Sequence, residues 1–140
     1  MFIDTNVLIH ARIQESPDHP IARARLRQAV RDSEPLRISR QVIREYLAVI
    51  TRPQAWLVPL PREEALASAS RLLSGFQILE DGPAVTETLL ALCREIPVGG
   101  RQIHDANIVA TMLAHGERRL LTFNTADFRR YTHHIQLADH

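Results

Sequence analysis

The stretch Phe2-Ile3-Asp4-Thr5-Asn6-Val7-Leu8-Ile9 opens the chain and shows the pattern from which the fold is predicted. Its short apolar run ends at Asp4 and Thr5, and both of these residue types are good helix N-caps. The spacing of apolar residues after them predicts a helical segment over about 6–14. The stretch therefore predicts a short strand that leads directly into a helix.

The same alternation of short apolar runs and helical segments continues along the chain. Strands are predicted at 36–38, 77–79, 119–122 and 135–137, and helices at 20–30, 40–51, 61–74, 82–96, 103–114 and 126–131. Such alternation is typical of a parallel sheet covered on both faces. We predict an α/β fold with residues 1–140 as a single domain, because 140 residues of 45% hydrophobic content fit the commonest domain size.

The composition excludes several reaction classes. All 17 basic residues are Arg, so the chain lacks the Lys that a P-loop or a Schiff-base mechanism needs. The net charge of +1 does not by itself indicate a nucleic acid or membrane partner. A lone cysteine, Cys93, excludes an intramolecular disulfide. With neither a signal-peptide pattern at the start nor an apolar run of about 18 residues, a soluble cytoplasmic protein without a membrane segment is expected.

Two acidic residues stand at positions of chemical interest in the first part of the chain. Asp4 follows the first strand, and ligands of parallel sheets bind outside the carboxyl ends of the strands. Its other interpretation is a plain N-cap of the following helix. Glu45 lies at the edge of an apolar helical stripe, beside Val42 and Val49, where a solvated side chain is the ordinary interpretation. Each signal taken alone is weak.

Two further acids follow in the second part. Asp105 heads an apolar helix face, ahead of Ile108 and Val109, and a carboxylate there is costly unless it is paired, hydrogen-bonded or metal-bound. A helix cap paired with Arg101 is the alternative for Asp105. Asp127 follows the strand at 119–122 and is otherwise a first-turn acid. Together the four acids place several carboxylates at one end of the sheet, where Mg²⁺ or Mn²⁺ would compensate their charge and activate water for attack on a phosphodiester.

Four segments, in order and spacing, resemble the motifs of PIN-domain proteins, in particular the VapC-type toxins of toxin–antitoxin pairs. They are Phe2-Ile3-Asp4-Thr5-Asn6-Val7-Leu8-Ile9, the segment Gln41 to Ile50 with Glu45, Ile103-His104-Asp105-Ala106-Asn107-Ile108-Val109-Ala110, and Leu121-Thr122-Phe123-Asn124-Thr125-Ala126-Asp127-Phe128. The resemblance spans nearly the whole chain. It implies a three-layer α/β/α sandwich with a central parallel sheet.

The resemblance also implies an activity and a set of roles. Family members are Mg²⁺-dependent endoribonucleases that often cut tRNA or rRNA, form homodimers and are neutralised by a VapB-type antitoxin; Mn²⁺ is expected to substitute for Mg²⁺. Carried over by position, the catalytic and metal-binding quartet is Asp4, Glu45, Asp105 and Asp127. The supporting polar groups are Thr5, Asn6 and Asn124, with Thr122 orienting a carboxylate or water.

Several other residues have two interpretations. Arg101 and His104 are candidates for contacting the substrate, although a surface salt bridge explains Arg101 equally well. The pairs Arg118-Arg119 and Arg129-Arg130 form either a phosphate-contacting rim or a solvated face. The segment from Ala55 to Pro61 matches none of the motifs.

Two other functions are compatible with parts of this sequence. Haloacid-dehalogenase-like phosphatases and receiver domains also place an Asp after their first strand, but they need a Lys, and the phosphatases need a second Asp where Asn6 stands here. A non-catalytic PIN scaffold that binds RNA or protein is the other alternative. The presence of all four acids argues against it.

Overall fold

The strands form one sheet whose centre is the first strand of the chain. Within residues 1–138, the part that this computed structural model describes, five parallel strands run in the order β3-β2-β1-β4-β5. They are β1 (Phe2–Ile3), β2 (Arg37–Ser39), β3 (Gln77–Leu79), β4 (Arg119–Leu121) and β5 (Gln136–Leu137). Phe2 of β1 pairs with Arg37 on one side and with Leu120 on the other. The predicted parallel sheet is confirmed.

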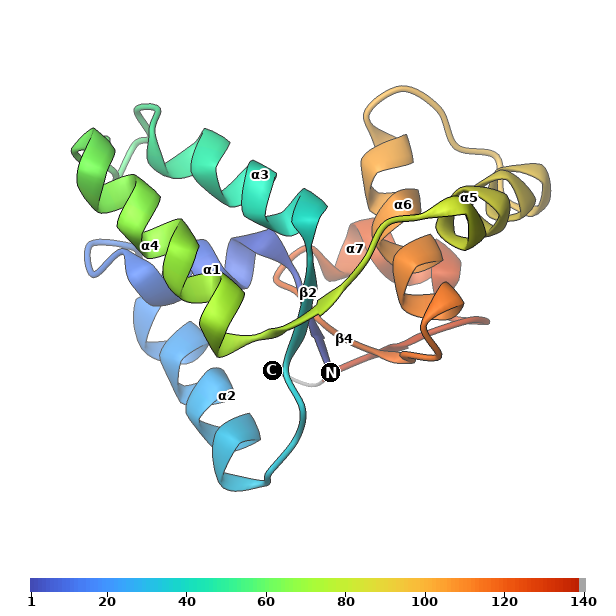
Figure 1. Ribbon diagram of the computed structural model, residues 1–140, viewed down its shortest axis with the longest axis horizontal. Coiled ribbons are helices and arrows are strands. Elements are labelled where there is room, and N and C mark those ends of the chain that lie inside the picture. Colours follow the sequence, from blue (N-terminus) through green and yellow to red (C-terminus); the bar gives the residue numbers. More distant parts are fainter. Residues whose placement is uncertain (139–140) are drawn as a thin grey trace.

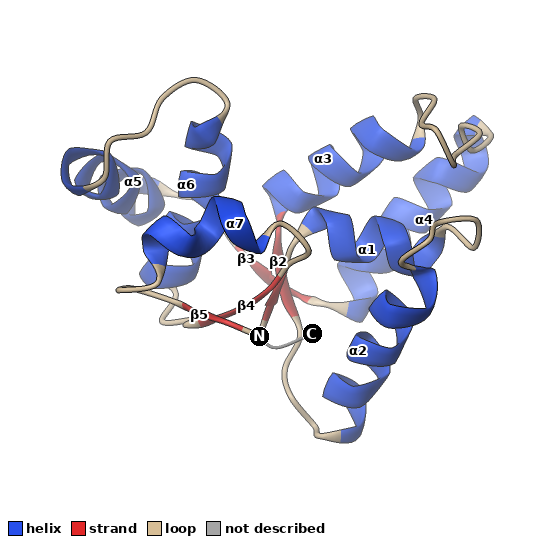
Figure 2. Ribbon diagram, turned by 180° about the vertical axis from the view of Figure 1, so that it is seen from behind, coloured by secondary structure: helices blue, strands red, loops and turns tan. Residues whose placement is uncertain are grey.

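Helices cover both faces of this sheet. They are α1 (Thr5–Arg12), α2 (His19–Arg31), α3 (Arg40–Ile50), α4 (Arg62–Gly75), α5 (Pro83–Glu95), α6 (Gln102–Ala114) and α7 (Thr125–Phe128), which a 3₁₀ turn, η1 (Arg129–Tyr131), extends. Figure 1 shows α1 to α4 on one side of the strands and α5 to α7 on the other. Figure 2 shows the same two layers from behind. The predicted three-layer α/β/α sandwich is confirmed.

The strand order explains why the helices divide in this way. From β1 the chain moves through β2 to β3 in one direction, and after β3 it crosses to the other side of β1 to form β4 and β5. Crossovers between parallel strands are right-handed, so reversing the direction of travel places the connecting helices on the opposite face. The reversal also creates a crevice outside the carboxyl ends of β1 and β4.

The central strands are buried on both faces, which holds their ends in place. Phe2, Ile3 and Leu120 have no exposed surface. Tyr46 of α3 and Met112 of α6 pack into the same core from the two helical layers. Burying a large apolar side chain contributes about 1.5–3 kcal/mol, so β1 and β4 are firmly anchored. The residues that follow these two strands are therefore fixed relative to each other.

The predicted boundaries agree with the structure to within two residues, and the small differences have local causes. α1 begins at Thr5 and ends at Arg12, because the backbone turns out of the helix at Ile13. The strand predicted at 119–122 ends at Leu121, and Thr122 instead uses its side chain at the sheet edge. The helix predicted at 126–131 divides into α7 and η1. Among residues 1–138, no helix combines the length and the apolar character that crossing a membrane requires.

Candidate active site

The site is built on the two loops that leave β1 and β4. Asp4 follows β1, and its backbone N–H donates to the carbonyl of Leu121, at 3.0 Å. The hydroxyl of Thr122, which follows β4, donates to Asp4 Oδ2 at 2.7 Å. The backbone N–H of Thr5 donates to the other carboxylate oxygen at 2.8 Å. Asp4 therefore caps α1, as its simpler interpretation required, and also presents its carboxylate to the crevice between the strands.

Asp4 is held in an environment that opposes its charge. The residue is 5% exposed. Burial raises the pKa of Asp4 to about 6, although the hydrogen bonds from Thr122 and Thr5 lower it, and the charges of Asp105 and Glu45 raise it further. A nearby cation would relieve both the burial cost and the repulsion.

Asn6 ties the two loops together. Its amide nitrogen lies 3.2 Å from Asp4 Oδ2 and 3.3 Å from the Thr122 hydroxyl. Its amide oxygen accepts from the backbone N–H of Phe123 at 3.1 Å. The Thr122 hydroxyl also accepts from the backbone N–H of Asn124, at 3.0 Å. The loop after β4 is thus fixed to the first turn of α1, while the Asn124 side chain makes no cap hydrogen bond to α7.

Glu45 reaches the site from α3. That helix starts directly after β2 and is capped by the Ser39 hydroxyl. One Glu45 oxygen accepts from the Thr5 hydroxyl at 2.9 Å, and the other accepts from the Gln41 amide at 2.8 Å. Glu45 is therefore half-buried and oriented by two donors rather than freely solvated.

Two residues of the site, Gln41 and Asn107, were missed at the level of sequence. The Gln41 amide nitrogen also donates to the carbonyl of His104, and its oxygen accepts from the amide of Asn107, both at 2.8 Å. These bonds join α3 to the first turns of α6 across the crevice. The available signal was the spacing of Gln41 and Glu45, since residues four apart share a helix face.

Asp105 and Asp127 stand on the far side of the crevice, in the first turns of α6 and α7. Burial raises the pKa of Asp105, and the carboxylates of Asp127 and Glu45 raise it further, while Arg130 and His104 lower it. Asp127 is exposed. The described structure contains no ion pair between Asp105 and Arg101, so the interpretation of Asp105 as an Arg101-paired cap is wrong.

The four acids form one electrostatic group without a counter-charge at hydrogen-bonding distance. Asp105 interacts through its charge with each of the other three. Across residues 1–138, none of the four takes part in a salt bridge. A cavity of about 380 Å³ opens beside them, and its lining includes the two predicted substrate-contact residues. The cavity is lined by Arg101, Gln102, His104, Asp105, Asn124, Asp127, Arg130 and Tyr131.

The donor set suits a hard divalent cation. All four acids offer carboxylate oxygens, the ligand type that Mg²⁺ and Mn²⁺ prefer. Among residues 1–138, no three His, Cys, Asp or Glu side chains lie close enough to hold one ion between them. Mg²⁺ usually binds through one or two carboxylates and keeps several waters. The arrangement fits that mode, and a cation there would offset the burial and the neighbouring carboxylates that raise the pKa of Asp4.

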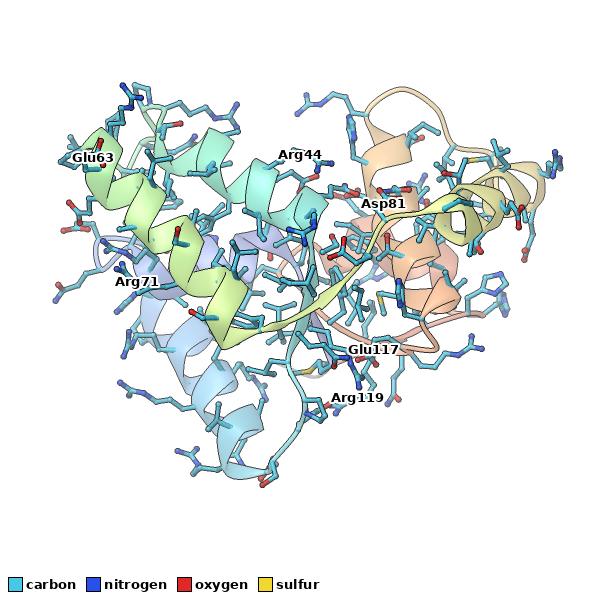
Figure 3. All side chains as sticks on the ribbon, viewed as in Figure 1. Arg44, Glu63, Arg71, Asp81, Glu117 and Arg119 are labelled. Atoms are coloured by element: carbon cyan, nitrogen blue, oxygen red, sulfur yellow. The ribbon has the colours of Figure 1, made fainter. Side chains whose placement is uncertain are left out.

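At the opposite edge of the sheet, where the strands begin, the acidic residues do have basic partners. There Glu117 forms ion pairs with Arg37 and the amino group of Met1, and Arg119 pairs with Glu34. Figure 3 shows Glu117 and Arg119 well below Asp81, which follows β3. The acids at the amino edge are neutralised by partners, whereas the quartet at the carboxyl edge is not.

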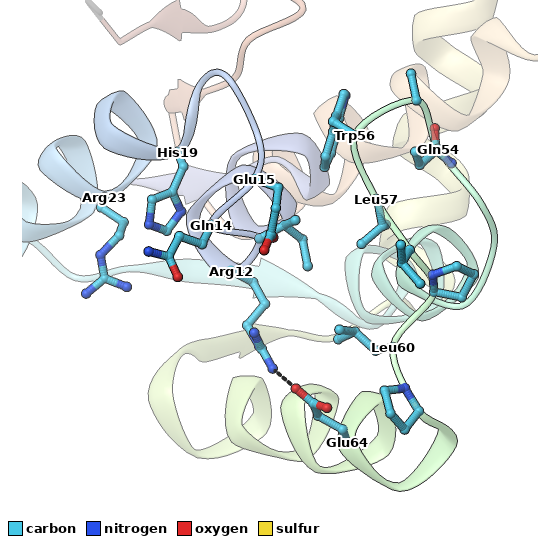
Figure 4. Close-up of a pocket in the computed structure, with 15 residues that line it drawn as sticks. Arg12, Gln14, Glu15, His19, Arg23, Gln54, Trp56, Leu57, Leu60 and Glu64 are labelled. Carbon is cyan, nitrogen blue, oxygen red and sulfur yellow. Dashed lines mark hydrogen bonds and ion pairs between the residues drawn. The ribbon is translucent and has the colours of Figure 1, made fainter.

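A larger cavity, of about 770 Å³, lies elsewhere and contains none of the quartet. Figure 4 shows it between the end of α1, the start of α2 and the segment that carries Trp56. Arg12 pairs there with Glu64 at 2.7 Å. Trp56 packs on the ring of His10, with centroids 5.2 Å apart, which gives the otherwise unmatched segment 55–61 a packing role.

The fold and the site together define an α/β protein with a parallel sheet. Its acidic crevice lies between β1 and β4, where the strand order reverses. The PIN domain family model matches residues 1–133, and the chain belongs to this family. The family resemblance seen in the sequence is thereby confirmed.

Individual relatives agree with this assignment. The chain is 26% identical to ribonuclease VapC24 of Mycobacterium tuberculosis, with 90% of this chain and 87% of VapC24 covered. It is also 26% identical to ribonuclease VapC31 of the same organism, with 81% of each covered.

Solved structures show the same fold. VapBC2 of Rickettsia felis, bound to a promoter DNA fragment, matches with a TM-score of 0.72 and 20% identity, covering 99% of this chain and 98% of that one. A toxin–antitoxin complex of Klebsiella pneumoniae matches with a TM-score of 0.62 and 26% identity, covering 91% and 89%.

Proposed function

We propose that this protein is a Mg²⁺-dependent endoribonuclease and the toxin of a toxin–antitoxin pair. The observation that carries the proposal is that Asp4, Glu45, Asp105 and Asp127 gather around one crevice, interact through their charges, and form no ion pair within residues 1–138. The names of the VapC relatives support RNA as the substrate. Mn²⁺ is expected to replace Mg²⁺, because both accept the same oxygen ligands.

The residues of the site have different roles in the proposed reaction. A bound Mg²⁺ would supply Lewis acidity and a water of lowered pKa. Asp4 and Asp105 are the best-placed carboxylates to hold it, since both are partly or fully buried and each faces the other's charge. Thr122 and Thr5 donate to Asp4, and Thr5 and Gln41 donate to Glu45, so these donors fix the carboxylate orientations.

The proposal includes protein partners as well. The solved complexes of Rickettsia felis and Klebsiella pneumoniae contain an antitoxin, which supports a VapB-like antitoxin for this chain. An apolar groove between α2 and α4, lined in part by Leu26, Val30, Leu36 and Phe76, offers a surface for an apolar antitoxin segment. We also propose a homodimer, and a strictly monomeric species at micromolar concentration in light scattering would contradict that part.

The test is cleavage of a generic RNA with Mg²⁺ and with EDTA. We expect products with Mg²⁺ or Mn²⁺ only, and none from an Asp4→Asn variant that melts at or above the wild-type temperature. Cleavage that survives exhaustive chelation would overturn the metal mechanism. A well-folded protein that binds RNA but never cleaves it would favour a non-catalytic module.

A further inference from the structure

The cavity beside the quartet contains groups that the proposed metal chemistry does not use. Arg101 and Arg130 line it, and within residues 1–138 neither guanidinium forms a hydrogen bond or an ion pair. Each Arg carries five N–H donors in a planar fork. The cavity is thus lined by two guanidinium groups without hydrogen-bond partners in the described part of the chain, next to the carboxylates of Asp105 and Asp127.

Arg130 is the more informative of the two. It stands close enough to Asp105 to lower the pKa of that carboxyl through its charge, yet it makes no salt bridge with Asp105 or with Asp127. Arg130 is exposed and lines the cavity, so its N–H donors are available to a third group that enters it.

Tyr131 adds an independent observation. The residue has no exposed surface, and its hydroxyl is a buried side-chain polar atom without a hydrogen-bond partner in the described structure. Tyr131 belongs to the lining of the same cavity, and its hydroxyl lies within electrostatic reach of Arg130 and Asp105. A buried polar group without a partner is rare and costs about 1–3 kcal/mol, so it calls for a ligand or a water that supplies the missing bond.

The unused groups specify the chemistry of that ligand. Both guanidiniums can only donate, and the Tyr131 hydroxyl is a free donor as well. A ligand with several acceptor oxygens and negative charge satisfies all three. Phosphate fits the planar Arg fork through paired hydrogen bonds, and it also joins the coordination of a neighbouring Mg²⁺.

We propose that this cavity is a phosphate subsite for the RNA strand, with Arg101 and Arg130 as its cationic walls and Tyr131 as its buried floor. The inference rests on the proposed ribonuclease function. Under it, Arg130 contacts the substrate, and Tyr131 is a positioning residue that gains a hydrogen-bond partner only when the cavity is filled.

The test uses Arg130→Ala with Arg129→Ala as the matched control. Arg129 precedes Arg130 in the same 3₁₀ turn, is also exposed, and does not line the cavity. Binding of a fluorescently labelled single-stranded RNA is measured by anisotropy in EDTA at several salt concentrations. We expect Arg130→Ala to weaken binding at least about fivefold and to reduce the slope of log K against log salt by about 0.7, as for one lost phosphate contact. Equal losses in the two variants would show a general charge effect and overturn the subsite.

Tyr131→Phe removes the hydroxyl and keeps the ring. We expect an unchanged or higher melting temperature in the free protein, together with several-fold weaker RNA binding. A clearly lower melting temperature, or unaltered RNA binding, would overturn the role of Tyr131. If the wild type neither binds nor cleaves RNA, the proposed function itself falls; if it does both and the variants match the control, only the subsite falls.

Discussion

At the scale of single residues, the two central acids of the site are held at a cost to stability. Burial and neighbouring carboxylates raise the pKa values of both Asp4 and Asp105. A group whose pKa is raised by folding destabilises the fold once it is ionised. The site therefore exchanges stability for function, as active sites commonly do.

Asp105→Asn should abolish cleavage and leave the metal-free protein as stable as the wild type or more stable. The substitution removes one charge from the repulsive group, which outweighs a loss of about 0.3–1 kcal/mol from the first turn of α6. Thermal melts in EDTA check this, with Glu87→Gln on the exposed face of α5 as the control. A clearly less stable Asp105→Asn protein would instead identify Asp105 as a structural cap.

Asp4 should make stability depend on pH. Its pKa is about 6 in the folded protein and about 3.8 in the unfolded chain, so the folded state binds the proton more tightly. The contribution of Asp4 to stability is fully present below pH 3.8 and is lost as pH rises to about 6. In EDTA, the free energy of unfolding of Asp4→Asn should improve relative to wild type by about 2 kcal/mol between pH 4 and pH 7. A difference that does not change with pH would contradict the raised pKa.

At the scale of elements, the end of α6 determines how the chain enters β4. Gly116 follows the C-cap of α6 with a φ of +74°, a conformation that disfavours residues with a Cβ. Gly75, at the end of α4, has no such φ, and neither glycine has an atom within 4 Å of a Cβ built on it.

Substitution of these two glycines by Ala should change the free energy of unfolding in opposite directions. Gly116→Ala should lower the free energy of unfolding by about 1–2 kcal/mol, through backbone strain alone. Gly75→Ala should raise it by about 0.5–1 kcal/mol, because Ala favours the helix and restricts the unfolded chain. Denaturant unfolding of both variants measures the pair. A stabilising Gly116→Ala would show that the positive φ is not required.

At the scale of the whole molecule, the amino edge of the sheet stabilises the fold and the carboxyl edge carries the candidate active site. The amino edge is closed by Glu117, which is buried and bonded to Arg37, the Met1 amino group and the backbone N–H groups of Arg118 and Arg119. Burial by itself raises the pKa of Glu117, but these partners lower that pKa to about 2. At the carboxyl edge, the quartet of Asp4, Glu45, Asp105 and Asp127 has no ion-pair partner within residues 1–138 and is open to a ligand.

Glu117→Gln should therefore destabilise the protein by about 2 kcal/mol at pH 7. The folded pKa lies below the unfolded value of 4.5, so this contribution is present above pH 4.5 and is lost as pH falls toward 2. The difference between wild type and variant should shrink between pH 5 and pH 2.5, while RNA cleavage at 25 °C stays unaltered. Loss of cleavage in a folded Glu117→Gln protein would mean that the two edges are coupled.

The sequence by itself determined the order and the approximate bounds of the elements and the local position of each acid. Asp4 directly after a strand, Glu45 at the rim of a helical stripe and Asp105 in a first turn are properties of a few neighbouring residues. Capping and apolar periodicity are local, so they can be predicted without knowing what lies opposite.

Only the tertiary structure decided which of these local features meet. Thr122 donates to a carboxylate 118 positions away, and Gln41 bonds a carbonyl 63 positions away, because the crossing from β3 to β4 brings α6 over to face α3. The missing partner of the Tyr131 hydroxyl is likewise a property of packing, invisible in its neighbours along the chain. Strand order and long-range hydrogen bonds depend on how the whole core closes, and no local pattern carries that information.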